Sequence, residues 1–129
     1  MIMSSDPYGL LINACRNDII ELAKEMIDNG INLDIQGSYG YTNLMWACHN
    51  NIELAKILIE KKANLDIQNI YGHTALMLAL NDDNKIAKML IDKGADLDLQ
   101  DKKGESVLLH VCYNDHIEIF SYILECIKN

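Results

Sequence analysis

Proline is nearly absent from this chain, since Pro7 is the only one in 129 residues. Long disordered linkers are usually rich in proline and polar residues, so we expect few of them here. No apolar run approaches the roughly 20 residues that a membrane helix needs. The first residues have neither the basic start nor the apolar stretch of a secretory signal. These shortages predict a folded chain that is neither anchored in a membrane nor secreted.

Positive charge is also scarce. The chain has 11 Lys and Arg against 19 Asp and Glu, and its formal net charge is −8. Nucleic-acid binding depends on basic side chains that replace counterions at the phosphates, and anionic membrane surfaces attract the same residues. We therefore expect neither a nucleic acid nor a membrane surface as a partner.

Repetition is what the chain has in abundance. The segment Gly40-Tyr-Thr-Asn-Leu-Met-Trp-Ala47 returns 32 residues later as Gly72–Ala79, and again as Gly104–Val111. The segment Asn32-Leu-Asp-Ile-Gln36 recurs in the same way at 64–68 and 96–100. A fixed period near 30 residues is typical of a stack of small units rather than of one closed core.

Residues 69–100 show what one unit contains. Gly72 supplies the positive φ of a tight turn, and Thr74 follows as the N-cap of a short helix. Residues 85–93 have the apolar spacing of a second helix with its lysines outward. Gly94 ends that helix as a left-handed cap, and a short extended segment leads into the next turn.

This order of turn, short helix, longer helix and extended arm resembles the ankyrin repeat. The resemblance rests on Gly-x-Thr-x-Leu-x-x-Ala at 40–47 and 72–79, on Ile-Glu-Leu-Ala-Lys-Ile-Leu-Ile-Glu at 52–60, and on Lys93-Gly-Ala-Asp-Leu-Asp98. It covers essentially the whole chain and implies an all-α ankyrin-repeat solenoid of stacked helix-turn-helix units with short β-hairpin fingers. We expect one domain over 1–129, with repeats at 6–36, 37–68, 69–100 and 101–129, the first and last acting as caps.

The chain departs from the repeat pattern at two places that affect the backbone. Lys62 stands where other units have Gly30 and Gly94, so we expect a lysine in the left-handed region at a cost of about 1 kcal/mol. Units two and three have one residue fewer between their helices, since Ala47 and Ala55 are eight apart. This shortening predicts a tighter turn between their helices.

The two ends of the chain differ in polarity. Asp6 and Pro7 predict the capped start of the first helix. The last helix, 116–128, has more apolar residues than one helix face needs, although a terminal repeat is normally polar outside. Either further repeats followed in a longer chain, or this end contacts another molecule. The apolar residues are Ile117, Ile119, Phe120, Ile123, Leu124 and Ile127.

The four cysteines lack the C-x-x-C spacing of zinc and redox motifs. Cys15, Cys48 and Cys112 share one repeat position, which predicts small core residues between helices. Free thiols fit a reducing, cytoplasmic compartment inside the cell. A thiol–imidazole pair of Cys48 with His49, or of Cys112 with His110, is not expected, because close helical neighbours do not face each other. We expect no cofactor, no metal and no enzymatic activity.

In the ankyrin family the hairpin tips and the exposed end of the first helix form the partner-binding face, and the resemblance implies the same face here. Tyrosine offers a large, rigid contact area at low entropic cost and is frequent at binding hot spots. For Tyr39 and Tyr71 the alternative is that they only pack hairpin against hairpin. Core positions are expected for Leu44, Trp46, Leu76 and Leu108. The candidate binding residues are Tyr39, Tyr41, His49, Asn50, Tyr71, His73, Asp82, Lys102, Lys103, Glu105, Tyr113 and Asn114.

We therefore predict a non-enzymatic protein–protein interaction module, an adaptor or an inhibitor, that binds a partner protein through this concave face. The physical basis is preorganisation, because a stiff stack presents its side chains without an ordering cost. The alternative is a structural protein that associates with itself, end to end, through the apolar last helix. A monomer is expected under the first interpretation and a dimer under the second.

Overall fold

Eight α-helices and one 3-10 turn follow one another along the residues that the computed structural model describes, which are 7–80, 84–113 and 116–128. The helices are α1 (Pro7–Arg16), α2 (Ile20–Asp28), α3 (Asn43–Asn50), α4 (Ile52–Glu60), α5 (Ala75–Leu78), α6 (Lys85–Asp92), α7 (Val107–Tyr113) and α8 (Ile117–Lys128), and the 3-10 turn η1 covers Ser38–Gly40. Consecutive helices pack in pairs, α1 on α2, α3 on α4, α5 on α6 and α7 on α8.

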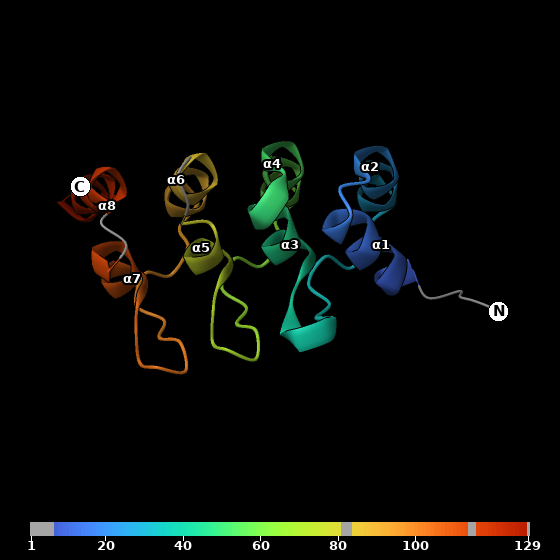
Figure 1. Ribbon diagram of the computed structural model, residues 1–129. Helices are drawn as coiled ribbons and strands as arrows, with labels where there is room; N and C mark the ends of the chain where they lie inside the picture. Colours follow the sequence, from blue (N-terminus) through green and yellow to red (C-terminus); the bar gives the residue numbers. More distant parts are fainter. Residues whose placement is uncertain (1–6, 81–83, 114–115, 129) are drawn as a thin grey trace.

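The pairs stack side by side, so that the odd-numbered helices form one layer and the even-numbered helices form a second (Figure 1). Each helix contacts its equivalent in the next pair, as α1 does with α3 and α2 with α4. Three loops extend from the edge of the odd-numbered layer, and we call them the first finger (36–41), the second finger (68–73) and the third finger (100–105). The predicted all-α repeat solenoid is confirmed.

One apolar core runs between the two layers from the first pair to the last. Leu44 and Leu76 lie in it with 2% and 1% of their surface exposed, as predicted. Leu108 holds the same repeat position and packs against this core, but it is only half-buried there. The reason is that no further helix pair covers α7 among the described residues.

The burial of the cysteines also depends on whether a neighbouring helix pair covers them. Cys15 and Cys48 are buried between helices, and this burial raises the pKa of each thiol to about 12. Cys112 is exposed, which contradicts its predicted place in the core. In the described part of the chain, α7 has a neighbouring pair on one side only, so a residue on its other side meets solvent.

The helix starts are capped as predicted in the two middle pairs. Thr42 Oγ1 accepts a hydrogen bond from the Met45 N–H at 3.2 Å, and Thr74 Oγ1 accepts one from the Met77 N–H at 3.3 Å. Each cap satisfies a backbone donor that would otherwise lack a partner in the first turn. The predicted N-cap of the first helix, Asp6, lies outside the described residues.

The interhelical turn in the second pair is tight, as predicted. Asn51 both ends α3 and begins α4, and its Oδ1 accepts a hydrogen bond from the Leu54 N–H at 2.9 Å. In the third pair α5 ends at Leu78 and α6 begins at Lys85. Residues 81–83 of that turn lie outside the described residues.

Left-handed backbone ends the second helix of three pairs. Gly30, Lys62 and Gly94 have φ of 82°, 70° and 90°. The prediction for Lys62 is therefore confirmed, and a residue with a Cβ is held where glycine carries no steric penalty.

The fingers are turns rather than β-strands in the part of the chain that the structure describes. Backbone hydrogen bonds close each finger, and in the second finger the Asn69 N–H donates to the His73 carbonyl at 3.0 Å and the Gly72 N–H to the Asn69 carbonyl at 2.9 Å. Adjacent fingers are also joined, because the Ile70 N–H donates to the Tyr39 carbonyl and the Lys102 N–H to the Tyr71 carbonyl, both at 3.0 Å. The three fingers thus form one continuous edge.

Candidate functional site

Two tyrosines stack on each other at the tips of the first and second fingers. The ring centroids of Tyr39 and Tyr71 are 6.5 Å apart, and the ring planes differ by 18°. Each residue still exposes much of its surface, 63% for Tyr39 and 47% for Tyr71. The hairpin-packing alternative therefore describes a real contact, and it leaves both rings accessible to another molecule.

A second aromatic group lies on α3 beside the first finger. Tyr41 stacks on Trp46 with a centroid distance of 4.5 Å, and His49 lies 6.2 Å from Tyr41 and 6.1 Å from Trp46. The guanidinium of Arg16, from α1, lies 5.2 Å from the Trp46 ring centre, within cation–π range. Trp46 is half-buried against the core rather than enclosed in it, and His49 is exposed.

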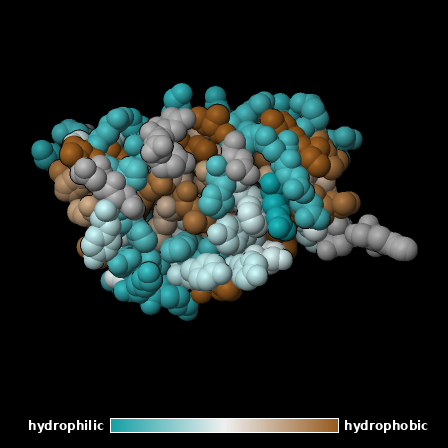
Figure 2. All heavy atoms as spheres, in the orientation of Figure 1, coloured by the Kyte–Doolittle hydropathy of each residue, from teal (hydrophilic) through white to brown (hydrophobic). Residues whose placement is uncertain are grey.

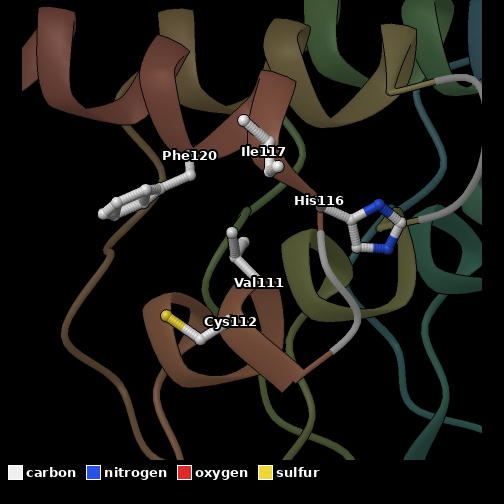
Figure 3. A pocket seen from close by; sticks show the side chains of 5 residues that line it. All are labelled: Val111, Cys112, His116, Ile117 and Phe120. Atoms are coloured by element: carbon white, nitrogen blue, oxygen red, sulfur yellow. The ribbon is translucent and has the colours of Figure 1, made fainter.

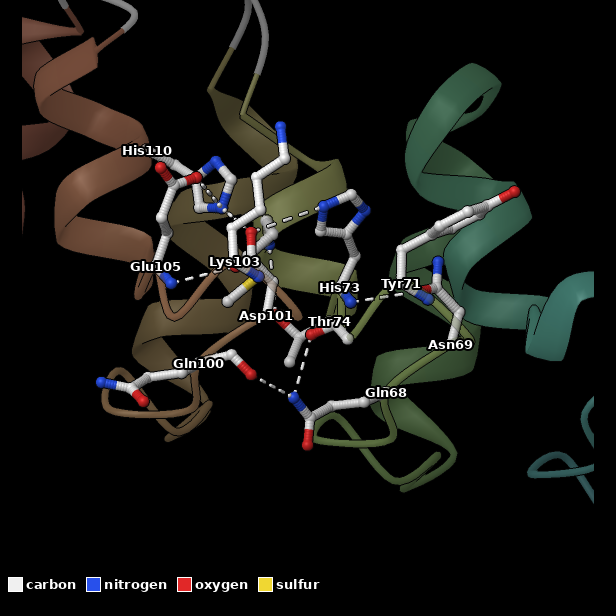
Figure 4. A network of polar contacts seen from close by, with 12 residues as sticks. Gln68, Asn69, Tyr71, His73, Thr74, Gln100, Asp101, Lys103, Glu105 and His110 are labelled. Atoms are coloured by element: carbon white, nitrogen blue, oxygen red, sulfur yellow. Dashed lines mark hydrogen bonds and ion pairs between the residues drawn. The ribbon is translucent and has the colours of Figure 1, made fainter.

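A polar cluster lies between the second and third fingers (Figure 4). The Asp101 side chain is buried, with 2% of its surface exposed. Its Oδ2 lies 2.8 Å from His110 Nε2 and 3.6 Å from His73 Nε2. Its Oδ1 accepts hydrogen bonds from the Lys103 and Glu105 N–H groups, both at 2.9 Å. The two imidazole rings meet edge to face at 5.8 Å.

The protonation of this cluster follows from burial and hydrogen bonding. Burial works to raise the pKa of Asp101, but hydrogen bonds from the Glu105 N–H, the His110 ring and the Lys103 N–H outweigh it and lower that pKa. Burial also lowers the pKa of His73, with nearby His110 and Lys103 acting in the same direction. The arrangement holds Asp101 as an anion and favours a neutral His73.

These side chains line a pocket of about 290 Å³ at the finger edge, together with Tyr71 and Lys102. Figure 2 shows the lower edge of the molecule, where the fingers lie, as mostly pale or teal. The face is therefore aromatic and polar rather than broadly apolar.

The structure brings most of the candidate binding residues into these groups. Tyr41 and His49 share the α3 group, whereas Tyr71, His73 and Glu105 border the pocket with Lys102 and Lys103. Tyr113, at the end of α7, has 68% of its surface exposed. The Asn50 backbone belongs to α3, but its side chain, like Asp82 and Asn114, lies outside the described residues.

Sequence reasoning missed Asp101 and His110 as members of a group. His110 was considered only beside Cys112, and Asp101 was not considered beside His73. The three residues come from neighbouring repeats. His73 and Asp101 belong to adjacent fingers, and His110 contacts Asp101 from α7.

The far end of the stack carries a different surface. A pocket of about 200 Å³ opens between α7 and α8, lined by Val111, Cys112, His116, Ile117 and Phe120 (Figure 3). On α8 the side chains of Ile117, Leu124 and Ile127 are exposed, whereas Ile119 and Ile123 are buried. Apolar side chains therefore occupy both faces of this last helix.

Comparison with protein families identifies the repeats. A family model described as ankyrin repeats, in three copies, matches residues 10–101 and 76–129. The chain belongs to the ankyrin-repeat family. Ankyrin repeats generally mediate protein–protein interaction, and the family is typically non-enzymatic. Comparison of this ankyrin-repeat chain with curated proteins gives no match. No helix in the described part of the chain is long and apolar enough to cross a membrane.

Proposed function

We propose that this ankyrin-repeat chain is a non-enzymatic binding module, an adaptor or an inhibitor, whose partner protein docks on the finger edge and the exposed ends of the odd-numbered helices. The observation that carries the proposal is the exposure of Tyr39 and Tyr71 on the fingers and of Tyr113 at the end of α7. Exposed tyrosines that already have fixed neighbours lose little entropy on binding.

The stacked fingers supply the rigidity that this mechanism needs. Tyr39 and Tyr71 are held by each other's rings and by the backbone bond from Ile70 to Tyr39. At the third finger Lys102 and Lys103 are exposed. They favour an acidic patch on the partner facing that finger, since complementary charges speed association and fix its orientation.

The partner is proposed to meet the chain in the cytoplasm. All four cysteines are free thiols, and two of them, Cys112 and Cys126, are exposed. Exposed thiols persist in a reducing compartment. Neither a nucleic acid nor a membrane is proposed as a partner, because the formal net charge is −8.

Affinity capture from native extracts tests the binding face. Tyr39→Ala with Tyr113→Ala removes two exposed rings, and the partner captured by the unmodified chain should be lost. Tyr41 is a poorer choice because it packs on Trp46, so its loss would also disturb the fold. The matched control is Lys56→Ala with Lys85→Ala, two exposed residues of the even-numbered layer. Partners that survive the tyrosine variant do not use the proposed face.

End-to-end self-association through α8 is the second candidate, favoured by the exposed Ile117, Leu124 and Ile127. Light scattering over a range of concentrations measures it directly. The substitution must avoid Ile123, which is 0% exposed, because a charge there would unfold the last pair. Leu124→Glu is the suitable variant, and a dimer that it abolishes without loss of helical signal supports self-association. A monomer at all concentrations removes this candidate.

A further inference from the structure

Three potential metal-ligand atoms converge between the second and third fingers. One possible ligand atom from each of His73, Asp101 and His110 lies within 4.8 Å of the other two, and both imidazoles approach Asp101 Oδ2 through Nε2. We propose that these residues bind a divalent transition-metal ion of the zinc type, which would join the third and fourth helix pairs. This site goes beyond the proposed binding function and does not depend on any partner.

The distances suit zinc. Zinc binds imidazole nitrogen and carboxylate oxygen at about 2.0–2.2 Å, so tetrahedral ligand atoms lie roughly 3.4 Å apart. Asp101 Oδ2 is 3.6 Å from His73 Nε2 and 2.8 Å from His110 Nε2. An ion entering between them replaces the His110–Asp101 hydrogen bond and needs only a small separation of the two groups.

A fourth ligand is close at hand. Glu105 Oε1 lies 3.9 Å from His110 Nε2, and its side chain is only 22% exposed. Glu105 or a water molecule from the open pocket can complete the coordination. The two carboxylates, Asp101 and Glu105, also neutralise the charge of a divalent ion.

The central ligand is oriented before any ion arrives. Asp101 Oδ1 is occupied by the backbone N–H groups of Lys103 and Glu105, both at 2.9 Å. Oδ2 is therefore the oxygen turned toward the two imidazoles. Outer hydrogen bonds that fix a ligand in this way typically contribute about 10- to 100-fold to metal affinity.

The spacing between ligands is set by contacts between the second and third fingers. The Lys102 N–H donates to the Tyr71 carbonyl at 3.0 Å, and Gln68 Nε2 donates to the Gln100 carbonyl at 2.9 Å. A Cβ on Gly72 would lie only 2.7 Å from Asp101 Cα, so the two fingers are in close contact. His73 and Asp101 thus face each other across a rigid joint.

The repeat scaffold itself does not require this ligand set. In the preceding repeat Asn69 takes the place of Asp101, and its Oδ1 accepts from the Tyr71 and His73 N–H groups at 2.9 and 3.0 Å. An amide is therefore sufficient to build the turn. The residues 32 positions before His73 and His110 are Tyr41 and Leu78. The second carboxylate oxygen and the two imidazoles are additions of the last two repeats.

Lys103 opposes the site. It lines the same pocket as the three ligands, and its positive charge repels a cation there. A neutral residue at this position should strengthen metal binding. The Lys103→Gln variant is therefore expected to bind zinc more tightly, whereas substitution of a ligand should weaken binding.

Zinc titration of the chelator-treated chain tests the proposal by calorimetry and by thermal unfolding. We expect one ion per chain and a rise in melting temperature that saturates with zinc and is not reproduced by magnesium. Cobalt should give the visible absorption of a tetrahedral site with nitrogen and oxygen ligands.

Asp101→Asn is the decisive variant, because Asn69 shows that an amide preserves the turn. It should lower zinc affinity by at least about tenfold, as should His73→Gln and His110→Gln, with the fold checked by circular dichroism. His49→Gln is the matched control outside the cluster.

Three results would overturn the site. The first is the absence of any zinc-dependent rise in melting temperature. The second is zinc binding that Asp101→Asn leaves unchanged. The third is binding that disappears in the combined Cys112→Ser and Cys126→Ser variant, since that would assign the ion to the exposed thiols.

Discussion

Gly40, Gly72 and Gly104 hold equivalent places in the three fingers, and their φ angles are 74°, 78° and 78°. Their surroundings differ. A Cβ added to Gly72 would lie 2.7 Å from Asp101 Cα, one added to Gly40 would lie 3.1 Å from Asn69 Cα, and one added to Gly104 would have no atom within 4 Å. Alanine at these three positions therefore separates backbone strain from steric collision.

The expected losses of folding free energy follow from this difference. Gly104→Ala introduces only a Cβ in the left-handed region, which costs about 1–2 kcal/mol. Gly72→Ala adds a collision with the backbone of the next finger, and overpacking of this kind costs about 1–3 kcal/mol more. The loss for Gly72→Ala is then roughly 2–5 kcal/mol. Gly40→Ala, with its looser contact, falls between the two.

Urea unfolding followed by circular dichroism gives the three values from the midpoints, provided that the slopes agree. The order of stability should be Gly104→Ala, then Gly40→Ala, then Gly72→Ala as the least stable. Equal losses at the three positions would refute the close approach of the fingers, because backbone strain alone would then account for all of them.

Three other predictions concern the helices and the thiols. Lys62→Gly should leave the melting temperature unchanged or raise it, because it removes a left-handed strain of about 1 kcal/mol, and a clear drop would contradict the positive φ. Leu76→Ala should lower the unfolding free energy by about 2–5 kcal/mol, whereas Leu108→Ala should lower it by less, and a denaturant series that reverses this order would contradict their burial. Thiol labelling of the native chain at about pH 8 should modify the exposed cysteines quickly and the buried ones only after unfolding. The exposed cysteines are Cys112 and Cys126, and the buried ones are Cys15 and Cys48.

Most of the fold could be predicted from the sequence because its signals are local and repeated. The Thr74 cap, the left-handed Lys62 and the tight interhelical turn at Asn51 each depend on a few neighbouring residues. Repetition strengthens such signals, since the same feature recurs at the same position. The helices were predicted for this reason.

The differences from prediction arose where a repeat position lacks its usual neighbours. Leu108 and Cys112 were assigned to the core because they share repeat positions with Leu44 and Leu76 and with Cys15 and Cys48. Among the described residues the last pair has a neighbouring pair on one side only, so Leu108 is only half-buried and Cys112 is exposed. Register within a repeat predicts which way a residue points, but its burial also depends on the next repeat.

The polar cluster could not be found by comparing equivalent positions. His73, Asp101 and His110 occupy three different positions of the repeat, and they meet only because neighbouring repeats are offset in space. The same holds for Arg16, which reaches Trp46 from the preceding pair. Contacts of this kind require the rise between repeats, which a single sequence does not supply.

The side-chain bonds between fingers have a consequence for how such a chain can grow. Gln36 Nε2 donates to the Gln68 carbonyl, and Gln68 Nε2 donates to the Gln100 carbonyl, at 3.0 and 2.9 Å. Asp34 and Asp66 likewise accept from the N–H groups 30 residues further on. A duplicated gene segment encoding one such unit would present the matching donor to one neighbour and the matching acceptor to the other. Lengthening by duplication therefore needs no new type of hydrogen bond between fingers at either junction.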